Sequence, residues 1–373
     1  MHINCFFDKN INMKRMYKSK IDKSILYSIF IFMFISIISI YSAGNLLGKP
    51  NLVIKQLIWY IIGFFIMYLI TKINNKIIYK YYKYLYLIGN MLLILLLIFA
   101  VPVNNSKCWF NVFGISFQPS EFMKIILVIT NAIVINNNKD KKDYIKIFKI
   151  IIITLIPSIL TFLEPDTGMV IIYIIISIIM LFISNIDSKW FTMTFLFLLL
   201  FLSIFLSLYF YSEDTFIKLF GTNFFYRIDR ILDWKNGSGM QLSNALTSIG
   251  SAHILGFGFN NTPIYFPEAQ TDFIFSVFAT NYGFIGTTLL IIFIIYFDMK
   301  IINLASKTKN NIDKYIISGI IGMLLYQQIQ NIGMNIGLLP ITGITLPFIS
   351  YGGSSLISYM ISIGLILNIT KKI

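Results

Sequence analysis

Four polar segments stand out in this apolar sequence because they hold the residue types that carry chemistry. They are residues 117–124, 164–168, 264–275 and 346–355. Together they supply carboxylates, a lysine, hydroxyls and amides, which are groups that transfer protons and hold polar substrates. None of the four segments indicates a function by itself, and they point to a common site only if they lie at one face of the protein.

The segment 117–124 has the pattern of a helix start. Pro119 suits the first helical turn, Ser120 is a candidate cap, and Glu121 favours the positive end of the helix dipole. Glu121 and Lys124 are three residues apart, so they share a helix face and can pair. A capped helix whose lysine reaches up to the membrane surface would give the same pattern. This alternative is disfavoured because a lysine one turn inside a span usually faces a cavity or a partner.

Two further segments present carboxylates. Glu164 and Asp166 flank Pro165 in a sequence typical of a tight turn, and they also offer two oxygen ligands to a divalent cation, which is few. Asp272 lies where a polar stretch enters an apolar helix. Partial desolvation there raises the pKa of a carboxyl group towards the range useful for a general base. The alternative is that Thr271 or Asp272 caps the helix, and a cap residue is compatible with catalysis because it is held rigidly.

The fourth segment, 346–355, interrupts an apolar region with serine and glycine. Irregular backbone at that depth must face protein or water, because lipid cannot satisfy it. The alternative is that these small residues only let helices pack closely.

The composition excludes most other classes of protein. Of 373 residues, 57% are hydrophobic and 12% are charged, about half the charge of a soluble domain. Two cysteines cannot form a disulfide scaffold, and two histidines leave little for a transition-metal site. The net charge of +14 is not gathered into one patch, so nucleic acid is not an expected partner. The chain is predicted to be an all-α polytopic membrane protein.

Ten apolar runs are long enough to cross the bilayer as helices. They lie near 24–43, 56–73, 82–101, 121–135, 147–163, 169–185, 190–211, 272–297, 315–336 and 344–368. The sequence predicts two parts: a basic segment, 1–23, without a cleavable signal peptide, and one membrane domain, 24–370. A large outer loop, about 212–271, separates the seventh and eighth spans.

The basic residues set the orientation. With ten spans, 22 of the 30 lysines and arginines fall on the side of both termini and seven on the other, with Lys124 inside a span. The positive-inside rule therefore predicts cytoplasmic termini. Nine of the sixteen acids fall at or beyond the outer boundary, as do all four polar segments, so the site is expected at the outer face.

The order of these motifs resembles the RodA/FtsW/SpoVE family, the SEDS proteins of cell shape, elongation, division and sporulation. The resemblance covers roughly residues 24–370. It rests on Gln118-Pro119-Ser120-Glu121 with Lys124, Pro165-Asp166 with Gly168, Gln270-Thr271-Asp272-Phe273, Tyr226-Arg227 with Arg230, Asn335 with Gly337-Leu338-Leu339-Pro340, and Pro347-Phe348-Ile349-Ser350-Tyr351-Gly352-Gly353.

The resemblance implies a ten-helix fold in a bacterial plasma membrane, with both termini cytoplasmic. It implies a peptidoglycan glycosyltransferase that polymerises lipid II at the outer face, in elongation or division, beside a class B penicillin-binding transpeptidase. Asp272 matches the family's catalytic acid. The resemblance leaves open whether Glu121 and Asp166 hold a divalent cation, magnesium or manganese. Substrate contacts are expected from Glu121, Lys124, Gln118, Ser120, Asp166, Lys107, Trp109, Arg227, Arg230, Gln270, Thr271 and Ser350.

The chain departs from the family pattern at two places. Cys108 replaces a usual arginine, with Lys107 as the neighbour that could compensate, and residues 279–283 lack two usual acids. Two other functions compete: a lipid II flippase, or a non-catalytic scaffold for the transpeptidase. A transporter should carry polar residues into the cytoplasmic half, and the inner halves of these spans are nearly free of charged residues.

Overall fold

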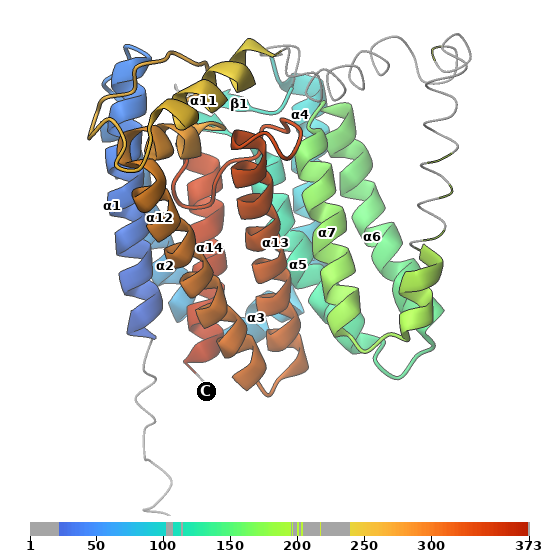
Figure 1. The fold of residues 1–373 in the computed structure, drawn as a ribbon. Helices are drawn as coiled ribbons and strands as arrows, with labels where there is room; N and C mark the ends of the chain where they lie inside the picture. The colour runs from blue at the N-terminus through green and yellow to red at the C-terminus, as the bar shows by residue number, and fades with distance from the viewer. Residues whose placement is uncertain are drawn as a thin grey trace, which may run out of the picture.

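In the computed structural model of the chain, long helices run up and down beside one another (Figure 1). The structure describes residues 22–101, 107–112, 115–194 and 239–371, with single positions at 196, 200, 203 and 217. Arg227, Arg230 and most of the predicted span 190–211 lie outside these residues. The end of the bundle with α11 and β1 is called the upper end, and the end with the C-terminus the lower end (Figure 1).

The elements follow the predicted spans closely. They are α1 (Lys23–Leu46), α2 (Leu52–Lys72), α3 (Asn75–Lys80), α4 (Tyr82–Phe99), β1 (Phe110–Val112), β2 (Ile115–Phe117), α5 (Pro119–Asn137), α6 (Asp143–Leu163), α7 (Thr167–Ile183), α11 (Met240–Ser251), α12 (Ile274–Lys307), α13 (Asn311–Asn335) and α14 (Gly353–Thr370). Strands β1 and β2 form one short antiparallel hairpin. The all-α prediction is confirmed.

Seven described helices are long and apolar enough to span a membrane: α1, α2, α4, α5, α6, α12 and α14. Helix α7 is apolar but has 17 residues. Helix α13 coincides with the predicted span 315–336 but carries several glutamines and asparagines that are buried against protein. These helices bear out a polytopic membrane fold without establishing the count of ten.

Two predicted boundaries were wrong. The last span was expected from residue 344, but α14 begins at Gly353, because Pro347 and the positive-φ residues Gly343 and Phe348 keep the preceding chain irregular. The span 272–297 continues as α12 to Lys307. The expected outer loop contains a helix, α11, in its described part.

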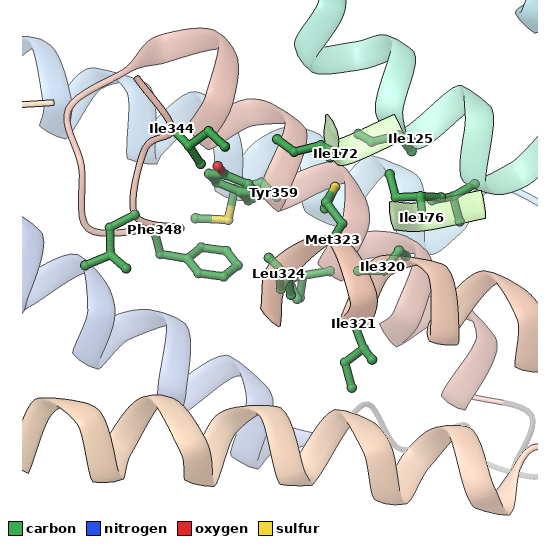
Figure 2. Close-up of a cluster of buried hydrophobic side chains, with 14 of the residues drawn as sticks. Ile125, Ile172, Ile176, Ile320, Ile321, Met323, Leu324, Ile344, Phe348 and Tyr359 are labelled. Atoms are coloured by element: carbon green, nitrogen blue, oxygen red, sulfur yellow. The ribbon is translucent and has the colours of Figure 1, made fainter. Parts of the chain in front are cut away.

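A buried apolar cluster joins the helices at the centre of the bundle (Figure 2). Ile125 of α5, Ile172 of α7 and Ile320 of α13 meet Tyr359 of α14 and Phe348 of the preceding loop there. Within their most apolar windows α5 and α14 are 83% buried, whereas α2 and α4 are 22% buried. Helices α5 and α14 are therefore central, as is α13, most of whose residues are buried, and α2 and α4 present their outer faces to lipid.

Helix α12 contains a break just beyond its first turns. Gly283 has φ 61° and ψ −161°, a conformation that only glycine adopts readily. The segment 253–258 pairs with the backbone on both sides of the break: Phe257 and Gly258 donate to the carbonyls of residues 280 and 281, and residues 284 and 285 donate to those of 253 and 254. The start of α12, which follows Asp272, is thus fixed by hydrogen bonds rather than by a continuous helix.

Candidate active site

A cavity of about 800 Å³ opens at the upper end of the bundle. Side chains from α2, the β hairpin, α5, α7 and the chain before α12 and α14 line it. Its polar and charged lining residues include Lys55, Gln118, Glu121, Asp166, Glu268, Thr271, Asp272, Gln327, Thr342, Thr345, Ser354 and Ser355. Residues from all four polar segments found in the sequence therefore meet at one site.

Asp272 is held by its backbone while its carboxylate stays available. Asn331 and Asn335, one turn apart on α13, both donate to the Asp272 carbonyl, at 2.9 and 2.8 Å. The Ser350 hydroxyl donates to the carbonyl of Thr271 at 2.7 Å. Within the described part of the chain, no hydrogen bond to the Asp272 carboxylate is found. This group can accept a proton from a bound molecule without first breaking an internal contact.

Burial raises the pKa of both aspartates that line the cavity. Burial raises the pKa of Asp272 to about 7, and the negative charges of Glu268 and Asp166 add to the shift. Burial also raises the pKa of Asp166 to about 6. Beside the cavity, burial and the charge of Asp166 raise the pKa of Glu164 to about 9, so Glu164 is protonated at neutral pH. Asp272 is thus poised near neutrality, as a general base requires.

Asp166 serves both the fold and the cavity. It caps α7 by accepting from the Met169 amide at 3.1 Å, and its other oxygen accepts from Gln118 Nε2 at 2.9 Å. Asp166 therefore takes part in the predicted turn and also lines the cavity. Gln118 in turn donates its backbone amide to Ser354, which joins the start of α5 to the start of α14.

Glu121 and Lys124 form the predicted ion pair, with 2.6 Å between Oε2 and Nζ. Lys124 is completely buried and does not reach up to a membrane surface. Its ammonium lies 3.4 Å from Gln327 Oε1 and 4.6 Å from the centre of the Tyr359 ring. Ser358 donates to Glu121 at 3.2 Å. Through these contacts the pair joins α5 to α13 and α14. Of its two members, Glu121 is the one that lines the cavity.

Lys55 lines the cavity, although the sequence placed it only among the seven basic residues of the outer side. With Ile58, Trp59 and Ile62 it follows the i, i+3, i+4, i+7 spacing of one helix face, and this face of α2 lines the cavity. Within the described residues Lys55 has no ion-pair partner. The sequence signal that could have identified this residue is a lysine at the start of an apolar span, four residues before a tryptophan.

The neighbouring Gln56 fixes that face. Its side-chain amide lies 3.3 Å from the Ser350 carbonyl, and its oxygen accepts from the Gly352 amide at 3.4 Å. Lys55 is therefore oriented by contacts with a segment almost 300 residues further along the chain, which no local pattern could show.

The other predicted site residues divide into two groups. Gln118, Trp109 and Thr271 line the cavity with the acids. Ser120, Lys107, Gln270 and Ser350 are not among the lining residues, and Lys124 lies beneath Glu121. The backbone carbonyl of Gln270 accepts from Tyr351, so Gln270 and Ser350 support the wall behind Asp272.

Two predicted helix caps were wrong. Gln118, not Ser120, is the N-cap of α5, and the buried Ser120 hydroxyl has no hydrogen-bond partner within the described residues. Phe273, rather than Thr271 or Asp272, is the N-cap of α12. Neither cap side chain makes a capping bond, and phenylalanine has no acceptor with which to make one. Tertiary hydrogen bonds at Gln118 and Asp272 hold the two helix starts.

Cys108 and Lys107 show how the departure from the usual motif is accommodated. Cys108 lines the cavity, is buried, and its thiol lies 3.1 Å from the Glu164 carbonyl. The Lys107 ammonium donates to the Leu97 carbonyl at 3.1 Å. The lysine expected to compensate for the missing arginine does not line the cavity, and Lys55 is the basic residue at the described cavity wall.

The residues considered for a divalent cation do not form a ready site. No group of three or more histidine, cysteine, aspartate or glutamate side chains suited to a metal is found among the residues described. Glu121 is paired with Lys124, and Asp166 already accepts from Gln118 and Met169. Two engaged carboxylates are a poor donor set for magnesium or manganese.

The fold and the site define a class: a helical membrane protein with a carboxylate-lined cavity at one end of its bundle. The family model of the FtsW/RodA/SpoVE cell cycle proteins matches residues 21–373. The chain belongs to this family, which confirms the resemblance seen in the sequence.

Individual relatives agree with this assignment. The chain is 33% identical to a probable peptidoglycan glycosyltransferase FtsW of Wigglesworthia glossinidia brevipalpis, over 84% of this chain and 82% of that protein. It is 30% identical to the stage V sporulation protein E of Bacillus subtilis, over 85% and 86% of the two chains.

Solved structures show the same fold. One belongs to a peptidoglycan synthase complex that coordinates polymerisation and crosslinking. It has a TM-score of 0.78 and 22% identity, covering 94% of this chain and 98% of that one. The crystal structure of the rod shape determining protein RodA of Thermus thermophilus has a TM-score of 0.69 and 23% identity, covering 94% and 97%.

Proposed function

We propose that this chain is a peptidoglycan glycosyltransferase that joins lipid-linked disaccharides of the lipid II type into glycan strands, in elongation or division. The observation that supports this most directly is the Asp272 carboxylate: it has a pKa of about 7, no hydrogen bond within the described residues, and a place in an 800 Å³ cavity shared with Glu121 and Asp166. The names of the sequence relatives point to the same activity.

The proposed reaction is one inverting glycosyl transfer. Asp272 accepts the proton of a sugar hydroxyl on one lipid-linked substrate as that oxygen attacks the anomeric carbon of the other. The bond from that carbon to the polyprenyl diphosphate breaks, and the diphosphate leaves with the bonding electrons. Lys55 is the described cavity residue whose positive charge suits the developing negative charge on the diphosphate. Arg227 and Arg230 stay predicted contributors from outside the described residues.

The proposed setting is a bacterial plasma membrane, with the cavity at the outer face and both termini in the cytoplasm. Among the described lysines only Lys49, Lys55 and Lys107 belong to the upper end, and the others outside the spans gather at the lower end, as the positive-inside rule expects for a cytoplasmic face. A class B penicillin-binding transpeptidase is the proposed partner, since one structural neighbour comes from a complex that couples polymerisation to crosslinking.

The depth of the cavity argues against the flippase alternative. Its deepest lining residues on α2, α7 and α13 are Ile62, Ile172 and Gln327, each within about 15 Å of the upper helix end at 1.5 Å per residue. Among the described residues, the lower half of the bundle holds two buried acids, Asp298 and Asp313. Asp298 accepts a hydrogen bond from Gln328, Asp313 accepts one from Tyr79, and both lie outside the cavity. The described cavity is one-sided, as a polymerase acting at one face requires.

The deciding experiment uses the purified full chain in detergent with lipid II, with and without its transpeptidase, followed by gel separation of glycan products. Polymer is expected from the wild-type chain with or without an inactivated transpeptidase. Movement of lipid II across vesicles without polymer would favour the flippase. Activity of neither kind, with the transpeptidase still bound, would favour the scaffold.

The pKa of Asp272 predicts the pH profile of polymerisation. Because the base must be ionised, kcat/KM should rise with pH and reach half its plateau near pH 7. Asp166→Asn distinguishes the two acids. The Asp166→Asn variant should keep the rise of kcat/KM with pH, shifted to slightly lower pH, because one negative charge near Asp272 is gone. If the rise disappears in Asp166→Asn, the ionisation that controls it belongs to Asp166, whose pKa is about 6.

Replacing Lys55 tests the proposed diphosphate contact. Lys55→Gln should lower kcat/KM by about 10²-fold, because a preformed positive charge beside the leaving group is lost. The matched control is Lys49→Gln, which removes an exposed lysine from the nearby connection between α1 and α2 without touching the cavity. Equal activity of the two variants would remove Lys55 from the reaction.

A further inference from the structure

A second pocket, of about 430 Å³, lies at the lower end between α4, α5 and α6, away from the proposed active site. It is lined by Tyr82, Val134, Asn137, Asn138, Lys141, Lys149, Ile152 and Ile153. Its volume falls within the range of small-molecule sites. Nothing in the glycosyl transfer mechanism uses these residues.

The pocket carries two positive charges and no negative one among its lining residues. Lys141 and Lys149 form no ion pair within the part of the chain described. The contrast with Lys146 is direct, because Lys146 lies one turn before Lys149 on α6 and is neutralised by Asp143 at 2.8 Å. The acid nearest in sequence, Asp140, does not line the pocket.

Lys149 is held in place rather than left to move in solvent. Its ammonium donates to Asn138 Oδ1 at 2.8 Å, and Asn138 is itself buried and fixed by donating to the Val134 carbonyl at 2.7 Å. One contact uses one of the three ammonium hydrogens, so two stay available to an acceptor in the pocket.

The apolar residues of α6 continue from the lysine towards the middle of the bundle. Ile152, three residues beyond Lys149, lines the pocket and is 42% exposed. Ile156 and Ile159 follow at helical spacing and are also exposed on this helix. A charged group at the helix end followed by an exposed apolar stripe matches a lipid, with its headgroup at the surface and a chain along the helix.

We propose that this pocket binds an anionic phospholipid, with its headgroup phosphate between Lys141 and Lys149 and an acyl chain along Ile152 of α6. The shared chemistry is a phosphate anion, and the apolar stripe selects the lipid over a free phosphate. Such a lipid would pack across α4, α5 and α6 at the end of the bundle opposite the proposed active site.

The test is a titration of the detergent-purified full chain with phosphatidylglycerol, followed by native mass spectrometry. Phosphatidylcholine with the same acyl chains is the reference lipid, and inorganic phosphate and glycerol 3-phosphate are the competitors. Phosphatidylglycerol should bind the wild-type chain more tightly than phosphatidylcholine. Lys141→Gln/Lys149→Gln should weaken phosphatidylglycerol binding by about tenfold or more, since two charge contacts are lost.

The control is Lys309→Gln/Lys314→Gln, which removes two exposed lysines at the same end that line no described pocket. This control should keep wild-type binding, and Lys141→Gln alone, at an exposed position, should weaken it partially without disturbing the fold. Equal loss in both double variants, equal binding of the two lipids, or full displacement by millimolar inorganic phosphate would each overturn the proposal.

Discussion

Asp272→Asn is expected to lower the rate of glycan polymerisation by about 10²- to 10⁴-fold, the usual contribution of a positioned general base. Asparagine keeps the size of the side chain but cannot take the proton of the attacking hydroxyl. The backbone contacts from Asn331 and Asn335 go to the Asp272 carbonyl, so they survive the substitution and the loop should keep its place. The measurement is the initial rate of polymer formation by the purified chain with lipid II.

Three comparisons make this result specific. Asp272→Asn should unfold at a temperature close to that of the wild type, which separates lost chemistry from lost structure. Asp140→Asn, an equivalent change in an exposed loop outside both pockets, should polymerise normally. Asn331→Ala should keep the carboxylate but loosen its anchor, and so reduce activity less than Asp272→Asn. Polymerisation by Asp272→Asn within tenfold of the wild-type rate would exclude Asp272 as the base.

The acids of the site could be predicted from the sequence because each lies in a local pattern with a physical meaning. Asp272 stands where a polar stretch enters an apolar helix, Asp166 follows a proline at a turn, and Glu121 is three residues from a lysine inside a span. The apolar runs likewise predicted the described helices to within a few residues in most cases. These features depend on neighbours along the chain, which the sequence displays.

The features that were missed depend on distant contacts. Lys55 faces the cavity because Gln56 bonds to residues 350 and 352, and the irregular chain before α14 is fixed by Tyr60, which donates to the Phe348 carbonyl. The break at Gly283 is stabilised by the segment 253–258. Apolar content alone predicted that the chain from residue 344 onward belongs to a span. Hydropathy carries no information about backbone groups that form hydrogen bonds with distant parts of the chain.

Breaking the buried Glu121–Lys124 pair should cost more stability than any other single charge removed from the described residues. Lys124→Met leaves the Glu121 carboxylate buried with Ser358 as its remaining donor, and an uncompensated buried charge costs about 3–5 kcal/mol. The measurement is the free energy of unfolding in mixed micelles, with denaturation by a second detergent. Lys189→Met, which breaks an exposed pair with Asp187, should change little.

The double variant Glu121→Gln/Lys124→Met distinguishes a structural pair from a functional one. It removes both charges together, so it should be more stable than Lys124→Met alone, because no uncompensated carboxylate remains. If the pair only joins α5 to α13 and α14, the double variant should also regain polymerisation. We expect it to regain stability without activity, because Glu121 lines the cavity beside Asp166 and Asp272, and a neutral glutamine would not reproduce its charge there. Recovery of both properties would assign the pair to the fold alone.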